Sequence, residues 1–239
     1  MTTINRYTEL VKENGLNEQD TFAAFDIIMD GKSELDDLIL FLEALNDNGI
    51  NQNHVLGAVN IMRQKMIAVD VPIESIDTCG TGGDGKFTLN VSTAVAFVLS
   101  ALDIPIAKHG NKSITSNCGS ADVLKALGIN IDMQIDKISE CIEKTGICFM
   151  FAPNHHPAMK HVAEARQILG KKGVKTIFNM LGPLLNPGNV KKQIIGVFSS
   201  EIQKIYKEVF NKSSDKKAFI VYGADGMDEI STEGNNKIA

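Results

Sequence analysis

Four glycines within six residues constrain this chain more than any other feature of its sequence. Residues 80–85 read G-T-G-G-D-G and lie between an expected short strand and an expected helix. A loop with so few side chains leaves its backbone N–H groups bare and lets an anion approach closely. The helix that follows adds the positive end of its dipole. The loop therefore predicts a phosphate-binding site.

Composition limits the partners that such a site can serve. With 239 residues, the chain is long enough for one large domain or two small ones. Its hydrophobic fraction of 44% is ordinary for a globular protein. A formal net charge of −5 disfavours general binding to nucleic acid or to anionic membranes. No apolar run has the length of a membrane span, and the N-terminus lacks the apolar core of a signal peptide. We therefore expect a cytoplasmic protein with neither nucleic-acid nor membrane partners.

The order of the expected elements predicts two domains. Residues 1–70 read as helical throughout, with Asn17 and Ser33 as N-caps, until Pro72 breaks the pattern. The expected helices there are 17–30, 33–49 and 52–69. From residue 73 onward, expected strands at 75–79, 104–108, 147–152, 194–198 and 218–222 alternate with expected helices at 91–102, 121–127 and 202–210. Such alternation predicts an α/β domain with a mainly parallel sheet, whose ligands bind at the carboxyl ends of the strands.

Two familiar nucleotide-binding motifs fit the glycine loop only in part. Gly80, Gly82 and Gly85 match the dinucleotide pattern G-x-G-x-x-G. The acid expected to bind a ribose would be Asp103, but it precedes the next strand instead of following it. The loop also matches the start of an ATP-binding P-loop, except that Phe87 stands where a Mg²⁺-binding Ser or Thr is required. Residues elsewhere in the chain must therefore decide between phosphate chemistries.

A third interpretation uses motifs from the whole chain. They follow one another as N-V-S-T at 90–93, K-H-G-N-K at 108–112, C-G-S-A-D at 118–122, A-P at 152–153, H-P-A-M at 156–159, Arg166, F-N-M-L-G-P-L-L-N-P at 178–187 and D-E-I-S at 228–231. Together with the glycine loop, these motifs resemble those of the anthranilate phosphoribosyltransferases. The resemblance runs from the N-terminal helices to the last residues. Several long motifs in one order make it far more specific than either glycine pattern alone.

The resemblance implies an activity and a fold. Members of this family transfer the phosphoribosyl group of phosphoribosyl pyrophosphate (PRPP) to the amine of anthranilate in tryptophan biosynthesis. They release pyrophosphate and require Mg²⁺. Their fold is α/β, with a small N-terminal helical domain that forms a homodimer and a larger domain of the nucleoside phosphorylase/phosphoribosyltransferase type. For this chain the resemblance implies a helical dimerisation domain at 1–70 and a PRPP-binding α/β domain at 73–239.

The resemblance also implies roles for particular residues. The expected PRPP contacts are Gly80, Thr81, Gly82, Gly83, Asp84, Thr88, Asn90, Ser92, Thr93, Lys108 and Ser120. The expected anthranilate contacts are Gly80, Asn111, Ala152, Pro153, His156, Met159 and Arg166. The expected Mg²⁺ ligands are Ser92, Asp228 and Glu229. No catalytic acid or base is nominated, because an uncharged aromatic amine can attack without a strong base.

Each of these roles has a physical rationale and a plainer alternative. The bare loop amides and Lys108 suit a leaving pyrophosphate, and hard carboxylate oxygens at 228–229 suit Mg²⁺. The planar guanidinium of Arg166 suits a carboxylate. Alternatively, the hydroxyl residues at the helix starts are ordinary caps, the acidic pair is a solvated turn, and the arginine lies on a surface helix.

The chain also departs from the family pattern. Lys112 stands where members commonly carry Arg after K-H-G-N, which keeps the charge but loses bidentate geometry. The chain stops at Ala239, soon after Asp228, whereas members continue further, so we expect a C-terminally truncated member with an incomplete α/β domain. Two other functions stay open. One is a non-catalytic relative that keeps the fold as a binding protein; the other is pyrimidine nucleoside phosphorylase, against which K-H-G-N and L-G-P-L-L-N-P argue.

Overall fold

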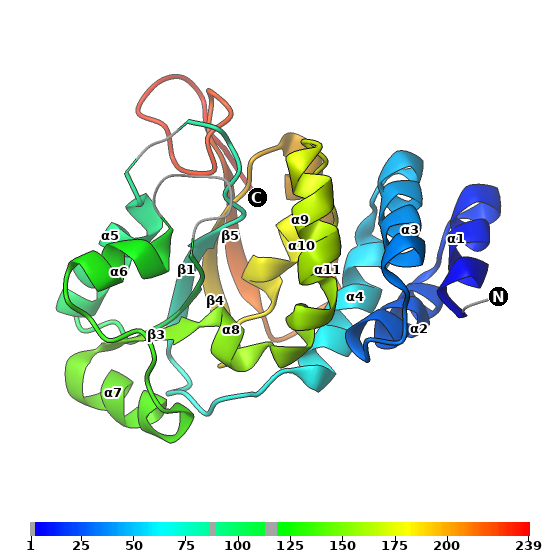
Figure 1. The fold of residues 1–239 in the computed structure, drawn as a ribbon. Coiled ribbons are helices and arrows are strands. Elements are labelled where there is room, and N and C mark those ends of the chain that lie inside the picture. The colour runs from blue at the N-terminus through cyan, green and yellow to red at the C-terminus, as the bar shows by residue number, and fades with distance from the viewer. Residues whose placement is uncertain (1–2, 87–88, 113–118) are drawn as a thin grey trace. The chain divides into compact units, whose positions relative to one another are not determined.

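The protein folds into two compact units. The structure, a computed structural model, describes residues 3–86, 89–112 and 119–239 (Figure 1). The first unit contains the residues up to Met66 together with His156–Leu185. The second contains Ile67–His155 together with Asn186–Ala239. The first unit is helical, and the second is built on a β-sheet.

The first unit contains helices at the three predicted positions and others that were not predicted individually. They are α1 (Thr3–Asn14), α2 (Glu18–Met29), α3 (Leu35–Asn48), α4 (Gln52–Lys65), η2 (Pro157–Val162), α9 (Ala163–Lys171), α10 (Phe178–Leu181) and η3 (Gly182–Leu184). Asn17 caps α2 with its side chain, as predicted, and Gly49 ends α3 at a φ of +91°. The N-cap of α3 is Glu34 instead of Ser33. The fourth helix ends earlier than predicted, where Met66 turns to an extended conformation.

The segment 156–185 packs with the N-terminal helices, although the sequence predicted it as part of the α/β domain. The ring of Phe25 on α2 lies 5.6 Å from the ring of Phe178 on α10. Arg63 on α4 donates two hydrogen bonds to the carbonyl oxygen of Leu184, at 2.8 and 3.2 Å. These partners are distant in the sequence, so no local pattern reveals that the segment joins the helical unit.

The second unit contains a six-stranded sheet in the order β3-β2-β1-β4-β5-β6. The strands are β1 (Ile76–Gly80), β2 (Ile106–Gly110), β3 (Ile147–Phe151), β4 (Lys192–Gly196), β5 (Lys217–Tyr222) and β6 (Lys237–Ile238). The helices of this unit are α5 (Val91–Ala101), α6 (Ser120–Ala126), η1 (Ile135–Lys137), α7 (Ile138–Thr145), α8 (Ala152–His155) and α11 (Ser200–Asn211). Neighbouring strands run parallel except β6, which is antiparallel to β5. The predicted α/β fold with a mainly parallel sheet is confirmed.

The central strand β1 marks the point where the order of the strands reverses. The chain continues from β1 to β2 on one side, whereas β4 pairs with the other side of β1. Gly80 at the end of β1 pairs in register with Gly196 at the end of β4. Open α/β sheets bind ligands outside the carboxyl ends of their strands at such a point. The glycine loop that follows β1 therefore lies where a ligand crevice is expected.

Helices cover both faces of the sheet, because side chains alternate between the faces along each strand. On one face, Leu124 of α6 packs with Phe149 of β3. On the opposite face, Ile142 of α7 packs with Cys148, the neighbour of Phe149 along the same strand. None of the helices that the structure describes is long and apolar enough to cross a membrane.

One glycine in the helical unit gives a test of this packing. A Cβ on Gly57 of α4 would lie 2.7 Å from the Thr21 Cβ and 2.8 Å from the Phe22 backbone nitrogen on α2. We predict that Gly57→Ala destabilises the protein by about 1–3 kcal/mol through overpacking, measured by urea denaturation. Gly170→Ala on α9 is the matched control, because open space surrounds it. It should stabilise the protein by about 0.5–1 kcal/mol. Equal effects of both substitutions would contradict the α2–α4 contact.

Candidate functional site

The glycine loop turns tightly at the end of β1. The Thr81 N–H donates a hydrogen bond of 2.9 Å to the carbonyl oxygen of Gly196, which extends the pairing with β4 by one residue. Gly82, Gly83 and Gly85 then adopt φ angles of +62°, +77° and +72°. Side-chain-bearing residues adopt this left-handed conformation at a cost, whereas glycine does so freely. The loop conformation thus depends on three of its four glycines.

Asp228 lies directly against this loop. Its Oδ2 accepts a hydrogen bond of 2.7 Å from the Gly82 N–H. A Cβ on Gly80 would lie 2.7 Å from the same oxygen, and a Cβ on Gly196 would overlap the Asp228 carbonyl oxygen. Gly196 was not among the predicted site residues, although a glycine at the end of an apolar strand signals close backbone approach. Two paired glycines therefore make room for the acidic segment.

The first turn of α5 brings polar groups to the same edge of the sheet. Asn90 caps the helix by accepting a hydrogen bond of 3.1 Å from the Thr93 N–H. Thr78 on β1 donates a hydrogen bond of 2.8 Å to the Ser92 carbonyl oxygen, which ties the helix start to the sheet. The Thr93 hydroxyl is buried and has no hydrogen-bond partner among the described residues. The cap of α5 is therefore Asn90 and not the Thr93 hydroxyl, which remains available to a ligand.

Lys108 is a cation buried beneath the loop, with only 2% of its surface exposed. Its Nζ donates hydrogen bonds to the Thr78 carbonyl oxygen and, at 3.4 Å, to the Ser92 Oγ. Burial lowers the pKa of Lys108, and the negative charges of Asp77 and Glu229 oppose that shift. Lys108 thus places positive charge between β1, β2 and the start of α5.

A buried polar network that the sequence analysis missed supports this arrangement. The Asp77 carboxylate accepts hydrogen bonds from the His109 N–H at 3.2 Å and from the Asn186 side chain at 2.8 Å. Asn186 also donates a hydrogen bond of 2.9 Å to the Ala107 carbonyl oxygen. Burial raises the pKa of Asp77, and the nearby charge of Lys108 opposes the shift. The network joins β1, β2 and the segment before β4, and its only sequence signal was the motif that contains Asn186.

Three carboxylates gather beside the loop. Burial, and then the negative charge of Asp84, raise the pKa of Asp228. Burial and the charge of Asp228 raise the pKa of Glu229 to about 7, although the Ser92 N–H and the charge of Lys108 oppose this shift. Buried acids that repel one another are costly to ionise, and a bound cation relieves that cost. The structure thus brings Ser92, Asp228 and Glu229 together.

The donor set fits a Mg²⁺ ion that is shared with a substrate. Ser92, Asp228 and Glu229 supply hard oxygen atoms of the kind Mg²⁺ prefers. Within the described part of the chain, no three His, Cys, Asp or Glu side chains converge into a complete metal site. Mg²⁺ commonly binds through one or two carboxylates and takes its remaining ligands from water and substrate phosphates. The residues present therefore fit partial coordination of this ion.

The ends of β2 and β3 lie side by side at the same edge. Gly110 pairs in register with Phe151, after which β3 leads directly into Ala152 and Pro153 at the start of α8. Asn111 follows Gly110, and its carbonyl oxygen accepts a hydrogen bond of 3.2 Å from the Ala121 N–H on α6. The predicted anthranilate contacts of this unit therefore come from adjacent strand ends.

Lys112 and Ser120 also lie at this edge of the sheet, near β2 and β3. Lys112 places its Nζ 5.9 Å from the centre of the Phe151 ring. Ser120 begins α6, and its Oγ lies so close to β2 that a Cβ on Gly110 would approach it to 2.7 Å. Gly110 is thus a second glycine that the sequence analysis did not single out. The predicted contact Thr88 lies outside the described residues.

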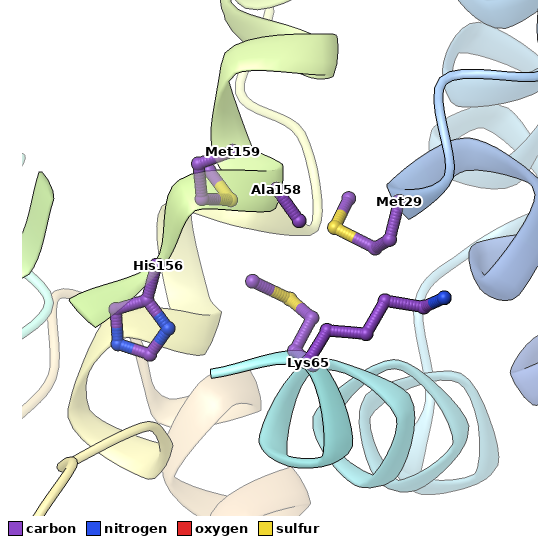
Figure 2. A pocket seen from close by; sticks show the side chains of 6 residues that line it. Met29, Lys65, His156, Ala158 and Met159 are labelled. Atoms are coloured by element: carbon purple, nitrogen blue, oxygen red, sulfur yellow. The ribbon is translucent and has the colours of Figure 1, made fainter. Parts of the chain in front are cut away.

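The remaining predicted anthranilate contacts belong to the helical unit. His156 and Met159 line a small pocket with Met29, Met62, Lys65 and Ala158 (Figure 2). His156 is buried, with its Nε2 3.1 Å from the Leu185 carbonyl oxygen. Arg166 on α9 is half-buried, with its guanidinium 5.7 Å from the centre of the Phe178 ring, and burial lowers its pKa. The predicted anthranilate contacts are therefore divided between the two units.

Comparison with known proteins first gives the class of the chain. Residues 73–239 match the model of the α/β domain of a glycosyl transferase family. The chain is 44% identical over 224 residues to an anthranilate phosphoribosyltransferase of Azorhizobium caulinodans, covering 94% of this chain and 64% of that protein. It is 43% identical over 233 residues to an Acetivibrio thermocellus enzyme of the same name, covering 97% of this chain and 67% of that protein.

Solved structures agree with this class. The anthranilate phosphoribosyltransferase of Thermus thermophilus matches with a TM-score of 0.89 and 34% identity, over 100% of this chain and 70% of that chain. The enzyme of Saccharomyces cerevisiae in complex with PRPP and Mg matches with a TM-score of 0.90 and 31% identity, over 99% of this chain and 70% of that one. The chain belongs to the anthranilate phosphoribosyltransferase family. It spans 64% of the length of the Azorhizobium relative.

The carboxylate cluster predicts a pH-dependent stability in Mg²⁺-free buffer. The pKa of Glu229 rises from the ordinary value of 4.5 to about 7 in the folded protein. Between these values the folded protein holds a proton that the unfolded chain has lost. Stability therefore falls as the pH rises through this range and stays lower above it.

Glu229→Gln should remove this loss, because glutamine stays neutral. We expect the variant to gain roughly 1–3 kcal/mol relative to the natural chain between about pH 5 and about pH 8, measured by urea denaturation. Glu233→Gln, which removes an exposed carboxylate nearby in the sequence, is the control and should follow the natural profile. Parallel profiles of all three proteins would show that Glu229 ionises normally.

Proposed function

We propose that this chain transfers the phosphoribosyl group of PRPP to the amine of anthranilate and releases pyrophosphate. The observation that carries the proposal is the glycine loop at the end of β1, with the Lys108 ammonium and the buried Thr93 hydroxyl beside it. Such a set of preorganised donors suits a phosphate chain. The relatives support it, since the yeast enzyme has been solved with PRPP and Mg and with 4-fluoroanthranilate.

The reaction is a displacement at the anomeric carbon of the ribose. The bond from that carbon to the pyrophosphate oxygen breaks, and its electron pair leaves with pyrophosphate. The anthranilate nitrogen forms the new bond and then gives up a proton to water. The leaving group gains negative charge, which the loop N–H groups and Lys108 stabilise. Holding both substrates in line lowers the entropic part of the barrier.

Ser92, Asp228 and Glu229 would hold Mg²⁺ at this site. When bound, Mg²⁺ supplies charge neutralisation to the pyrophosphate oxygens. The chain itself supports this role by placing Asp228 beside the loop and by holding the start of α5 on Thr78. Asp84 adds a third negative charge, which strengthens the preference for a divalent cation.

For anthranilate we propose recognition of its carboxylate by Arg166, whose planar guanidinium can donate two parallel hydrogen bonds. Asn111 would provide a polar contact. The remaining proposed contacts are Gly80, Ala152, Pro153, His156 and Met159. No side chain is assigned as a general base.

Several expectations from the sequence stay predictions. They are the place in tryptophan biosynthesis, the homodimer formed through the helical unit, and the cytoplasmic location. The relatives' names do not favour the alternative of pyrimidine nucleoside phosphorylase. A non-catalytic binding role is the alternative that an activity measurement must decide.

The direct test is the loss of anthranilate fluorescence on mixing the chain with PRPP. The proposal expects loss that requires both PRPP and Mg²⁺ and releases one pyrophosphate for each anthranilate consumed. Omission of Mg²⁺ and replacement of PRPP by ribose 5-phosphate are the controls. Binding of PRPP without turnover would favour the non-catalytic alternative, and absence of both would reject the proposed function.

The glycine loop gives a sharper prediction about PRPP. Gly82→Leu should weaken PRPP binding at least about tenfold and leave anthranilate binding unchanged, because the side chain would obstruct the loop N–H groups. Gly128→Leu is a matched control: both glycines have positive φ angles, of +62° and +79°, and open space around them. Calorimetric titrations with each ligand distinguish the two variants. Equal weakening of PRPP binding in both would mean that backbone strain, and not the loop, is responsible.

Arg166 gives a prediction about anthranilate. Arg166→Ala should raise the KM for anthranilate by an amount equivalent to roughly 1.5–3 kcal/mol, the usual value of a hydrogen bond to a charged group. The KM for PRPP should stay unchanged. Arg166→Lys keeps the charge but loses the bidentate geometry, so its KM should be intermediate. An unchanged anthranilate KM in the alanine variant would place Arg166 outside the substrate site.

A further inference from the structure

Sulfur-bearing side chains gather on the face of the sheet that α7 covers. Cys148 of β3 is 3% exposed and belongs to an apolar cluster that also contains Met150 of the same strand and Ile142 of α7. Met133, from the segment before η1, and Cys141 of α7 are half-buried and pack against the same cluster. Three segments of the chain thus bring sulfur atoms to one apolar region of the α/β unit.

The contacts of Cys148 and Cys141 show how close these sulfur atoms are. The Cys148 Sγ lies 3.5 Å from the Sδ of Met133. The Cys141 Sγ lies 3.4 Å from the carbonyl oxygen of Ile147, the residue before Cys148 in β3. Burial, and then the neighbouring Cys141 thiol, raise the pKa of Cys148. We call Met133, Cys141 and Cys148 the sulfur group.

The sulfur group lies apart from the candidate functional site. Cys148 is the second residue of β3 and pairs in register with Ala107 of β2. The candidate site forms at the carboxyl ends of these strands, where Gly110 pairs with Phe151. The proposed function therefore does not use the side chains of the sulfur group.

Access and composition both suit a metal ion. Cysteine and methionine often serve as ordinary apolar side chains, and packing alone would explain a single one of them here. Two thiols and a thioether as neighbours also form a set of soft donors. Both cysteines are free, and Met133 and Cys141 keep part of their surface exposed. A small ion can therefore reach the sulfur group from solvent.

The chemistry of these donors selects the cation. Soft thiolate and thioether ligands favour Cu(I), whereas Mg²⁺ and Ca²⁺ take oxygen ligands. A structural Zn²⁺ site takes four Cys, His or carboxylate ligands. In the part of the chain that the structure describes, no three such side chains converge. Cu(I) is satisfied by two or three sulfur ligands, and the apolar side chains around the group would keep water from the ion.

We propose that the sulfur group binds Cu(I), with the Cys141 and Cys148 thiolates and the Met133 thioether as its ligands. Binding is a ligand exchange: each thiol gives its proton to water as its bond to copper forms, and no electron is transferred. A bound ion would join α7, β3 and the segment before η1. The inference does not depend on the proposed function.

The test is a competition for Cu(I), under anaerobic reducing conditions, between the 239-residue chain and the chelator bathocuproine disulfonate. The colour of the chelator complex gives the number of ions that the chain takes and its Kd. The variants are Cys141→Ala, Cys148→Ala and Met133→Leu, which keeps the apolar volume. Cys79→Ala on β1 and Met66→Leu in the helical unit are the matched controls, because each removes a sulfur atom elsewhere. Circular dichroism checks that every variant folds, and half-buried Cys141 keeps the test decisive if Cys148→Ala unfolds.

The proposal expects the chain to take one Cu(I) ion. It expects Cys141→Ala and Cys148→Ala each to weaken binding by at least about tenfold, and Met133→Leu to weaken it less, while both controls bind normally. A chain that takes no Cu(I) from the chelator would overturn the proposal. Binding by Cys141→Ala or Met133→Leu that is as tight as that of the controls would also overturn it.

Alkylation identifies the ligating thiol independently. Labelling with N-ethylmaleimide, followed by mass analysis of peptides, should show that Cu(I) slows the reaction of Cys141 and leaves that of Cys79 unchanged. Slower labelling of Cys118, which lies outside the described residues, in place of Cys141 would contradict the proposal. No measurement contains PRPP or anthranilate, so failure here leaves the proposed function untouched.

Discussion

The burial of one ammonium group organises the edge of the sheet where the site forms. An ammonium group removed from water must find hydrogen-bond acceptors and negative charge, or it gives up its proton. Lys108 finds a carbonyl oxygen on β1, a hydroxyl group at the start of α5 and the charges of Asp77 and Glu229. These partners come from three separate segments, namely β1, the start of α5 and the acidic pair. The requirement to solvate a single cation therefore fixes the relative positions of the strand end, the helix start and the acidic pair.

The helical unit is organised by a different kind of contact. Its two chain segments, up to Met66 and from His156 to Leu185, are separated by most of the sheet unit in sequence. Aromatic packing of Phe25 on Phe178 and the hydrogen bonds from Arg63 to a carbonyl oxygen join them. The two ends of the motif at residues 178–187 thus belong to different units. Its first part completes the helical unit, and Asn186 near its end enters the polar network beneath the sheet.

Features with a local sequence signal could be predicted, whereas features that depend on the pairing of distant segments could not. The alternation of strands and helices and the N-cap at Asn17 are local, and the structure contains both. The tight turn of the glycine loop could also be predicted, because glycines at neighbouring positions are the local signal for positive φ angles. The role of Gly196 depends on its register with Gly80, and the sequence of neither strand alone determines that register. The burial of Lys108 is equally invisible, since lysine normally lies at the surface.

Asp228 gives the proposed phosphate site a carboxylate of the chain's own. In this structure its carboxylate occupies the Gly82 N–H, which is a position that a phosphate oxygen would otherwise take. A weakly held anion such as sulfate must compete with a carboxylate that is tethered to the same chain and so present at high effective concentration. A phosphate chain that arrives with its own divalent cation has an advantage, because the cation gives the displaced carboxylate a new partner. At the proposed phosphate site, the loop would therefore select for polyphosphates that carry a divalent cation over simple anions.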